Sequence, residues 1–279
     1  MTPLWVVGDV HGAYDSLRSL LLGAGLIDHD DAWHGGPSHL VFLGDYLDRG
    51  PRGMDVVRLV RRLEGQAPAT GGRVTALIGN HEVMFLAAQS FRAQDPGDTL
   101  GFLDYWRSNG GQNSDAAQVQ VTDLDWLRAR PALAHAGEWL LMHADSPFYR
   151  RLGRSVEAVN RSVHALLRSP DPKLWSTFLN HFADRFAFTD TDAQAVATGL
   201  LGTYGGARVV HGHTPVYVLN DELGLDTDMD EPLPITYADG LCVAVDSGMA
   251  YRDGAGFIVR LDDVGVAQTV ALGTDLGDF

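Results

Sequence analysis

Five polar clusters along the chain carry residue types that bind divalent metals, and each cluster follows a short apolar run. The clusters are Asp9 with His11, Asp45, Asn80 with His81, His143, and His213. An apolar run that leads into a polar stretch with glycine is typical of a buried strand that ends in a loop. One such cluster would be weak evidence, because a single histidine beside a strand is usually structural. Folding alone does not explain five of them, and we therefore predict one shared metal site.

The donor types narrow the choice of metal. Carboxylate, imidazole and amide groups without a thiolate favour manganese, iron, zinc or magnesium over softer metals. A carboxylate such as Asp45 could bridge two cations about 3.5–4 Å apart, which would lower the pKa of a shared water and hold phosphate oxygens. Two dications with Asp9, Asp45 and a bridging hydroxide leave a locally positive site, to which Arg49 adds. Such a site suits an anionic phosphate ester.

The expected elements bring these residues together. Apolar runs at 4–7, 40–43 and 74–78 each precede a polar cluster, and apolar residues at helical spacing follow each cluster. Three repeats of strand, loop and helix are typical of a layered α/β fold, in which ligands bind beyond the carboxyl ends of the strands. Further strands are predicted at 139–142, 208–210, 241–246, 256–261 and 266–272. Turn signals at Gly254 and Gly265 predict that the last three pair antiparallel.

The remaining segments have a different character. We expect a single domain over residues 1–279, with inserted cap segments at about 88–130 and 150–203 that would shape the substrate pocket. The first segment is rich in aromatic residues, and the second is mainly helical in pattern. The segment 220–234 is acidic, contains two prolines and is predicted to be a surface loop.

Charge and composition exclude several classes of protein. The chain has a formal net charge of −15 and a pI near 4.9, so a broad basic surface for DNA or RNA is not expected. The one cysteine, Cys242, lies in an apolar run and is predicted to be buried in a strand. No apolar run reaches the roughly 18 residues of a membrane span, and we expect no signal peptide, because the first candidate site residue is already at position 9. We expect a cytoplasmic protein that contacts no membrane.

The order of the motifs resembles that of calcineurin-like metallophosphoesterases. The segments Gly8–Gly12, Gly79–Glu82 and Gly212–Thr214, with His143, are shared broadly across that superfamily. The ending Asp48-Arg49-Gly50 resembles the phosphoprotein-phosphatase branch, which also holds the bacterial diadenosine tetraphosphatases. Residues 24–28, 33–36 and 71–84 resemble the bacterial Shewanella-like protein phosphatases. The resemblance is dense over residues 4–86 and implies an α/β fold with a layered β-sandwich, flanking helices and inserted helical cap segments.

The resemblance also implies a role for each matching residue. The expected metal ligands are Asp9 and His11 for the first ion, Asp45 as the bridge, and Asn80, His143 and His213 for the second. Arg49 would hold phosphate oxygens with help from Asn80. His81 would donate a proton to the leaving oxygen, and Asp48 would orient that imidazole and keep it charged. This division makes chemical sense, because an alkoxide leaves poorly without a positioned acid.

Three expectations about the pocket are less specific. Tyr251 resembles a family tyrosine that lines the site, although a tyrosine at a strand end can equally cover the core. Related phosphatases hold phosphate with a second arginine, for which Arg185 and Arg208 are candidates without a matching motif. His211 stands two residues before His213, so both would share one face if the segment were extended.

The resemblance implies a phosphatase that uses two divalent ions, manganese above all, with iron, zinc or magnesium as alternatives. It would hydrolyse phosphate monoesters by attack of a metal-bound hydroxide, with a phosphorylated protein (Tyr or Ser/Thr) or a small phosphoester as substrate. The alternative is a hydrolase of dinucleoside polyphosphates, such as diadenosine tetraphosphate, or of polyphosphate. A nuclease is disfavoured by the acidic charge. A non-catalytic binding protein would be expected to lack His81 or Asp48, and both are present.

Overall fold

Two five-stranded sheets form the centre of the computed structural model, which describes residues 2–225, 232–252 and 254–273. The first sheet has the strand order β10-β9-β1-β2-β3, and the second has the order β4-β5-β6-β8-β7. The strands of the first sheet are β1 (Leu4–Val7), β2 (His39–Phe42), β3 (Arg73–Ala76), β9 (Phe257–Leu261) and β10 (Val266–Ala271). Those of the second are β4 (Leu133–Ala136), β5 (Trp139–Met142), β6 (Arg208–Pro215), β7 (Ile235–Tyr237) and β8 (Cys242–Asp246).

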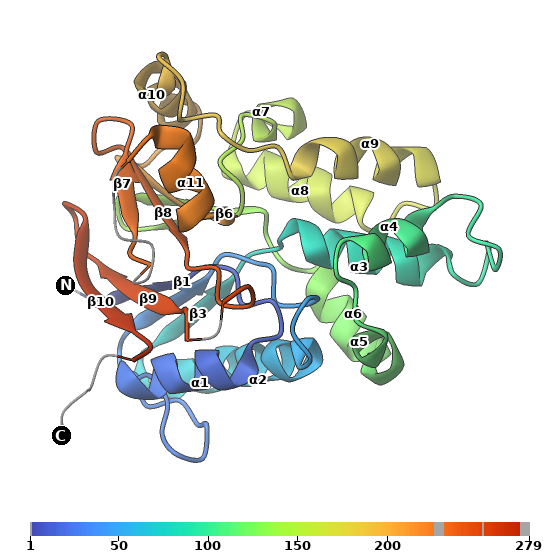
Figure 1. Cartoon of the computed structure of the whole chain (residues 1–279), viewed down its shortest axis with the longest axis horizontal. Helices are drawn as coiled ribbons and strands as arrows, with labels where there is room; N and C mark the ends of the chain where they lie inside the picture. Colours follow the sequence, from blue (N-terminus) through green and yellow to red (C-terminus); the bar gives the residue numbers. More distant parts are fainter. Residues whose placement is uncertain (1, 226–231, 253, 274–279) are drawn as a thin grey trace.

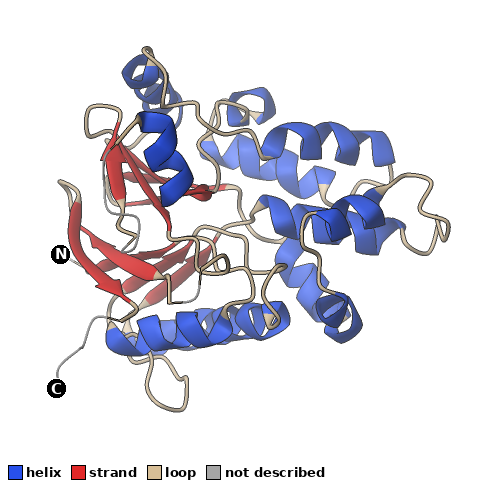
Figure 2. Cartoon of the chain, in the orientation of Figure 1, coloured by secondary structure: helices blue, strands red, loops and turns tan. Residues whose placement is uncertain are grey.

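Helices cover the outer faces of both sheets (Figures 1 and 2). The helices are α1 (Tyr14–Gly23), α2 (Gly53–Gln66), α3 (Asn80–Phe91), α4 (Phe102–Ser108), α5 (Asn113–Gln118), α6 (Val121–Arg128), α7 (Tyr149–Leu152), α8 (Val156–Leu166), α9 (Pro172–Phe182), α10 (Ala193–Tyr204) and α11 (Val216–Leu223), with a 3-10 turn at Ala67–Thr70. Helices α1 and α2 lie against the first sheet, and α10 and α11 lie against the second. The others, from α3 to α9, gather at one end of the sheets.

Parallel pairing in the first sheet explains where the polar clusters meet. Strands β1, β2 and β3 run parallel, with Val7 beside Phe42 and Phe42 beside Ala76. These strands are apolar and almost wholly buried, as expected for strands covered on both faces. In the second sheet β5, β6 and β8 also run parallel. The loops after the parallel strands of the first sheet therefore lie close to those after the parallel strands of the second sheet. Both sets of loops lie between the sheets and the helices α3 to α9.

The segments expected as insertions contain helices that pack on one another. In α9, Trp175, Phe178, Leu179 and Phe182 are buried and recur at helical spacing, which gives this helix one apolar face. That face meets α3, where the Phe91 ring lies 6.0 Å from the Trp175 ring. The aromatic residues of the two segments thus extend the hydrophobic core of the sheets between the helices.

The predicted antiparallel pairing is right for one pair of strands and wrong for another. Strands β9 and β10 form an antiparallel pair. Strand β8 does not pair with β9, because it belongs to the second sheet, between β6 and β7, whereas β9 pairs with β1 in the first. The chain thus crosses from one sheet to the other after β8. A turn signal such as Gly254 marks a change of direction, but it carries no information about which sheet the next strand joins.

Two further expectations need correction. The segment 220–234 is only partly a loop, because α11 continues to Leu223; residues 226–231 lie outside the described part of the chain. Strands β4 and β7 were not predicted, since each is short and mixes polar with apolar residues. Cys242 is buried in β8 as expected. Within the described residues, no helix combines the length and apolarity that crossing a membrane requires.

Candidate metal centre and active site

The loops at the carboxyl ends of five strands bring the predicted metal ligands together. Ligand atoms of Asp9, Asp45, His143 and His213 lie within 4.8 Å of one another, and so do those of His11, Asp45 and His81. All of these side chains are buried. Asn80 joins them through its amide oxygen, which lies 2.9 Å from His143 Nε2. Asp45 belongs to both groups, which is the position that the bridging role requires.

Backbone carbonyls fix the orientation of two of the imidazoles. His11 donates Nδ1–H to the Leu47 carbonyl at 2.9 Å, and His143 donates Nδ1–H to the Leu43 carbonyl at 3.0 Å. Each ring therefore presents the lone pair of Nε2 to the cluster. His11 Nε2 lies 3.6 Å from an oxygen of Asp45, and His143 Nε2 lies 3.5 Å from the other. A histidine held in this way is oriented as a metal ligand.

Glu82 is buried beneath the cluster and organises the loops. Its Oε2 accepts hydrogen bonds from the backbone N–H groups of Asp45 and Gly79, at 2.8 and 3.0 Å. Its Oε1 accepts from those of Tyr46 and Leu47, at 2.8 and 3.2 Å. Glu82 thus joins the loops after β2 and β3 through four backbone N–H groups.

Three of the candidate ligands adopt backbone conformations that non-glycine residues rarely visit. His11, Asp45 and His213 have φ angles of 48°, 53° and 64°. Such conformations cost roughly 1–3 kcal/mol each and persist where the surroundings enforce them, often at functional sites. Here hydrogen bonds do so: the Asp9 carboxylate accepts the His213 N–H at 2.9 Å, and the Asp45 backbone carbonyl accepts the His11 N–H at 2.9 Å.

The electrostatics of the cluster favour added positive charge. Burial lowers the pKa of His11 to about 3 and lowers the pKa values of His143 and His213, so these imidazoles are neutral and free to act as ligands. Burial, together with the charges of Asp246 and Asp45, raises the pKa of Asp9 well above its ordinary value. Buried carboxylates among neutral imidazoles lack a counter-charge, which divalent cations would supply.

Asp246 adds an unsatisfied acceptor to this site. Its Oδ1 accepts the Gly248 N–H at 2.9 Å, but its buried Oδ2 has no hydrogen-bond partner among the described residues. An orphaned carboxylate oxygen is costly unless a cation, or a water held by one, is nearby. The donor set and this oxygen together fit a site for divalent ions. The sequence contained the signal, because Asp246 also ends an apolar run and precedes glycine.

Beside the ligands, His81, Asp48 and Arg49 form a connected group. His81 Nδ1 lies 2.8 Å from Asp48 Oδ2, and its Nε2 lies 2.9 Å from Arg49 Nη2. The Arg49 guanidinium lies over the Tyr251 ring, 4.6 Å from its centre. Tyr251 is 41% exposed, so it lines the pocket instead of covering the core. The structure therefore places Arg49, Asn80, His81 and Tyr251 around the mouth of the cluster, with Asp48 buried behind His81.

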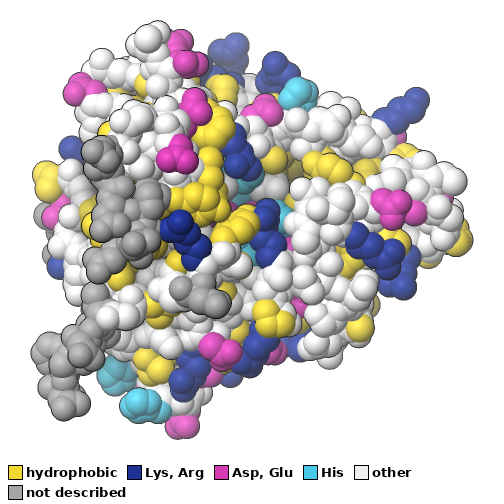
Figure 3. Space-filling model, viewed as in Figure 1, with side chains coloured by type: hydrophobic (Ala, Val, Ile, Leu, Met, Phe, Trp, Pro, Cys, Tyr) yellow, Lys and Arg dark blue, Asp and Glu magenta, His cyan; other side chains and the backbone are white. Residues whose placement is uncertain are grey.

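A cavity of about 320 Å³ opens above these groups, and it contains a second arginine. It is lined by His11, Asp45, Arg49, Asn80, His81, Tyr105, Asn109, Ala183, Arg185, His213, Pro215, Tyr217, Val218 and Tyr251. Arg185 Nη2 lies 3.2 Å from His213 Nε2, whereas Arg208 is remote and bonds the Asp263 carbonyl. Figure 3 shows Lys/Arg and His side chains gathered with hydrophobic ones in a hollow of this face.

A match to a family model covers most of this arrangement. The model of the calcineurin-like phosphoesterases matches residues 2–217, which include every predicted metal ligand. This chain belongs to the calcineurin-like phosphoesterase family. Membership in this family supports hydrolysis of a phosphoester bond as the class of reaction. The buried Asp and His groups of the chain could bind two metal ions.

Individual relatives of the phosphoesterase carry different names. It is 38% identical over 81 residues to Shewanella-like protein phosphatase 2 of Arabidopsis thaliana, a match that covers 29% of this chain and 21% of that protein. It is 31% identical over 177 residues to the symmetrical bis(5'-nucleosyl)-tetraphosphatase of Vibrio cholerae, covering 63% of this chain and 55% of that protein. The chain thus matches about a fifth of the first relative's length and about half of the second's.

Solved structures share the fold. The cold-active protein-tyrosine phosphatase of a psychrophilic Shewanella species superimposes with a TM-score of 0.70 at 22% identity, covering 98% of this chain and 80% of that one. A yeast protein serine/threonine phosphatase superimposes with a TM-score of 0.60 at 14% identity, over 97% of this chain and 79% of that one. The predicted layered α/β fold and the resemblance to Shewanella-like phosphatases are confirmed.

Asp145 explains how the phosphoesterase positions Arg185, which no sequence motif marks. Its Oδ2 accepts the Phe186 N–H at 2.7 Å, and its Oδ1 accepts the Thr214 hydroxyl at 2.8 Å. Phe186 has a φ of 68°, which turns the chain next to Arg185. The end of β5 thus holds a loop that lies about forty residues later in the sequence.

The condition under which His211 would share a face with His213 is not met in the structure. His213 has a positive φ, and the pairing of β6 with β8 is irregular at this point, so the segment is not simply extended. His211 Nε2 lies 2.7 Å from the Tyr237 hydroxyl, and its ring is fully buried. His211 is therefore a structural residue of the second sheet.

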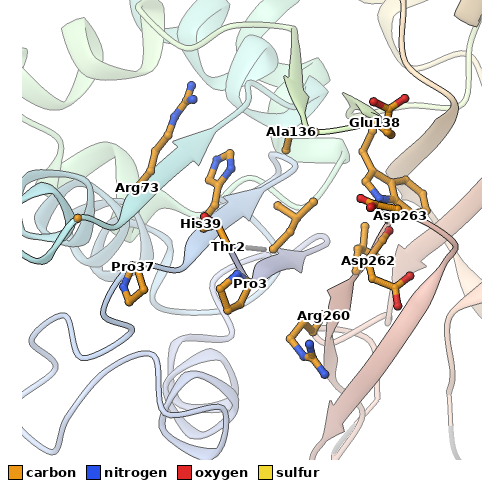
Figure 4. A pocket seen from close by; sticks show the side chains of 15 residues that line it. Thr2, Pro3, Pro37, His39, Arg73, Ala136, Glu138, Arg260, Asp262 and Asp263 are labelled. Atoms are coloured by element: carbon orange, nitrogen blue, oxygen red, sulfur yellow. Dashed lines mark hydrogen bonds between the residues drawn. The ribbon is translucent and has the colours of Figure 1, made fainter.

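A larger cavity of about 450 Å³ lies at the opposite edge of the sheets, beside the amino ends of β1, β2 and β3 (Figure 4). His39 and Arg73 lie on one side of it, and Glu138, Asp262 and Asp263 lie on the other. None of the predicted site residues lines it. In α/β folds ligands bind at the carboxyl ends of strands, so the smaller cavity is the candidate active site.

Proposed function

We propose that this phosphoesterase is a dimetal-dependent phosphatase that hydrolyses phosphate monoesters, with phosphorylated protein side chains as substrates. One observation carries the proposal: His81, Arg49 and Arg185 line a cavity over a buried Asp/His cluster, and Asp48 lies buried behind His81. This arrangement pairs a proton donor with phosphate-binding cations beside a site for divalent metals.

Asp9, His11 and Asp45 would hold one ion, and Asp45 with Asn80, His143 and His213 would hold the other. The bound ions, manganese in our proposal, would acidify a water and neutralise charge on the phosphate. The imidazoles are already neutral, so binding needs no prior loss of their protons.

The side chains of this chain would complete the reaction. Arg49 and Arg185 point their guanidinium groups into the cavity, where a phosphate could take hydrogen bonds from both and from Asn80. Arg49 Nη2 donates to His81 Nε2 in this structure, so His81 would carry a proton on Nε2 for the leaving oxygen once Arg49 turns to a bound phosphate. Asp48 holds Nδ1 at 2.8 Å and stabilises the charged ring, which is the role of a carboxylate behind a general acid.

The rim of the cavity is suited to a substrate whose phosphorylated side chain is aromatic. Tyr105, Tyr217 and Tyr251 line it, and the rings of the last two lie 6.4 Å apart. Aromatic walls of this kind pack against a phenyl ring at little entropic cost. We therefore propose phosphotyrosine as the preferred phosphorylated residue, with phosphoserine and phosphothreonine as weaker substrates.

The second candidate function is hydrolysis of dinucleoside polyphosphates. The relative from Vibrio cholerae is named a bis(5'-nucleosyl)-tetraphosphatase and matches 63% of this chain. The metal ligands would serve either function, and the tyrosine rim could also stack on a base. The two candidates differ only in the substrate that the cavity selects.

A hydrolysis panel on protein reconstituted with manganese, magnesium or zinc tests the proposal. It compares phosphotyrosine and phosphoserine peptides with diadenosine tetraphosphate, with Asp45→Asn as the inactive control. We expect turnover of the phosphotyrosine peptide that is lost by at least a hundredfold in the variant. Faster cleavage of diadenosine tetraphosphate would favour the second candidate, and no turnover with manganese, magnesium or zinc would refute both.

A further inference from the structure

We propose that Trp106, in the first inserted segment, is a positioning residue for phosphate-ester hydrolysis, because its indole N–H fixes the carboxylate that orients His81. The inference rests on the proposed phosphatase function. Among the described residues, the Trp106 side chain hydrogen-bonds neither a candidate metal ligand nor a phosphate-binding arginine, so it would act through Asp48.

The hydrogen bonds form a short chain from α4 to the cavity. Trp106 Nε1 donates to Asp48 Oδ1 at 2.7 Å, while Asp48 Oδ2 lies 2.8 Å from His81 Nδ1. Asp48 and Trp106 are both 0% exposed, so water does not compete for these bonds. With one oxygen held by each partner, the carboxylate cannot rotate away from the imidazole. The indole thus decides where Asp48 points.

The surroundings of Trp106 are shaped to hold the indole in place. On one side the Phe85 ring lies 5.5 Å from the ring of Trp106. On another lies Gly111, where a Cβ atom would stand 2.4 Å from Cε2 of the indole. Only glycine allows the backbone to approach this closely. The ring is therefore clamped between α3 and the loop that follows α4.

The same loop holds the backbone of the catalytic segment. Gly110 has a φ of +98°, and its carbonyl accepts the Arg49 N–H at 2.7 Å. Asp48 and Arg49 have φ angles of 70° and 65°, which is a rare conformation for two consecutive non-glycine residues. Gln112 Nε2 donates to the Arg49 carbonyl at 3.1 Å. The inserted segment thus fixes both the side chain of Asp48 and the backbone beside it.

This arrangement predicts an effect that depends on the leaving group. A poorly leaving alkoxide needs the proton from His81, whereas a 4-nitrophenolate leaves with little help. Loss of the indole N–H would let Asp48 rotate and would misplace the imidazole. The consequence is slower hydrolysis of phosphoserine with nearly normal hydrolysis of 4-nitrophenyl phosphate.

The test compares Trp106→Phe with Trp126→Phe. Phenylalanine keeps an aromatic ring at position 106 but removes the N–H. Trp126 provides a matched control, because its Nε1 also donates to a carboxylate at 2.7 Å, that of Glu64, away from the site. In Trp106→Phe we expect kcat for a phosphoserine peptide to fall about tenfold and that for 4-nitrophenyl phosphate to fall less than threefold. Trp126→Phe should leave both within twofold.

Several outcomes would overturn the inference. Equal losses of kcat on the two substrates would show that Trp106 has only a structural role. Wild-type rates in Trp106→Phe would show that the indole N–H has no role in the reaction. If the wild-type protein hydrolyses neither substrate with metal, the proposed function fails first, and the inference falls with it. Should Trp106→Phe not fold, Gly111→Ala displaces the indole from the other side, and the same selective loss is required of it.

Discussion

A single buried glutamate, Glu82, shows how much of the site depends on groups behind the ligands. Each of its oxygens accepts two backbone N–H groups, and the four donors come from the loops after β2 and β3. Both carboxylate oxygens are therefore occupied by backbone N–H donors. Glutamine has only one side-chain oxygen, so it cannot accept all four hydrogen bonds.

We predict that Glu82→Gln destabilises the protein by about 2–4 kcal/mol, because the amide NH₂ must face two N–H donors that then lack an acceptor. For a chain of this size the melting temperature should fall by roughly 5–15 °C. Scanning calorimetry measures this. Glu222→Gln, at an exposed position, is the control and should leave the melting temperature unchanged. An equally small shift in both variants would contradict the structural role of Glu82.

A second residue-scale prediction concerns Asp145, which holds the loop of Arg185. Asp145→Ala removes the acceptor of the Phe186 N–H and should raise KM for a phosphopeptide about tenfold, because Arg185 is then poorly placed to bind phosphate. Asp145→Asn should restore most of the affinity, since its amide oxygen can accept the same N–H. Steady-state kinetics of the wild type and the two variants measures these KM values. Identical KM values in all three proteins would show that Asp145 does not position Arg185.

At the residue scale, the sequence allowed the candidate metal ligands to be predicted, but not the residues that position the catalytic groups through tertiary contacts. The strand-end pattern indicated the candidate ligands, and it also applied to Asp246, which we did not single out. Arg185 and Trp106 carry no such pattern, because each reaches the site across the fold: Trp106 is 58 residues from Asp48. Contacts of this length depend on tertiary packing and leave no trace in local spacing.

At the scale of elements, the segment around α5, which we expect to be part of an insertion, is anchored to α2 by a buried carboxylate. Asp115 in α5 accepts the Met54 N–H at 3.1 Å through Oδ1, while Oδ2 is buried without a hydrogen-bond partner among the described residues. Burial, with a contribution from the charge of Asp48, raises the pKa of Asp115 to about 6. The contact between α5 and α2 should therefore depend on pH.

We predict that Asp115→Asn becomes more stable relative to wild type as pH rises from about 4 to 7. A carboxyl group whose folded pKa lies above its unfolded value of 3.8 stabilises the fold in its protonated form, and this contribution is lost as pH rises through about 6. At about 1.4 kcal/mol per pKa unit, the upper limit is about 3 kcal/mol. Urea unfolding at pH 4.5 and 7.5 measures the difference. A constant difference would contradict the prediction.

The elements also show where prediction from the sequence stops. Apolar runs located β1, β2, β3, β5 and β8 within a residue or two, because buried parallel strands are continuously apolar. Strand β4, with the sequence Leu-Ala-His-Ala, has neither an apolar run nor a clean alternation. The assignment of β8 and β9 to different sheets could not be inferred either, since both have the same apolar pattern.

At the scale of the whole molecule, the candidate metal centre joins the two sheets. Asp9, Asp45 and Asn80 follow strands of the first sheet, and His143 and His213 belong to the second. Bound ions would therefore cross-link the halves of the β-sandwich. The net charge of −15 would also be partly neutralised at the point where buried carboxylates meet.

We predict that metal removal lowers the stability of the whole chain, because an ion that binds only the folded state stabilises it by about 2.7 kcal/mol at a hundredfold excess over Kd. Chelator treatment should lower the melting temperature by roughly 5–10 °C, and manganese should restore it. Asp45→Asn should show little response to either treatment. An identical melting temperature with and without metal would argue against ions between the sheets.

The most direct test of the two-ion site is to count bound metal and measure turnover on the same samples. Metal-free protein is titrated with manganese. At each point, bound manganese is measured by elemental mass spectrometry, and the rate of hydrolysis of a phosphotyrosine peptide is measured on the same sample. We expect two ions per chain, with full turnover only when both are present and neither ion retained tightly in Asp45→Asn. Full turnover by metal-free protein, or by protein that binds a single ion, would contradict the account.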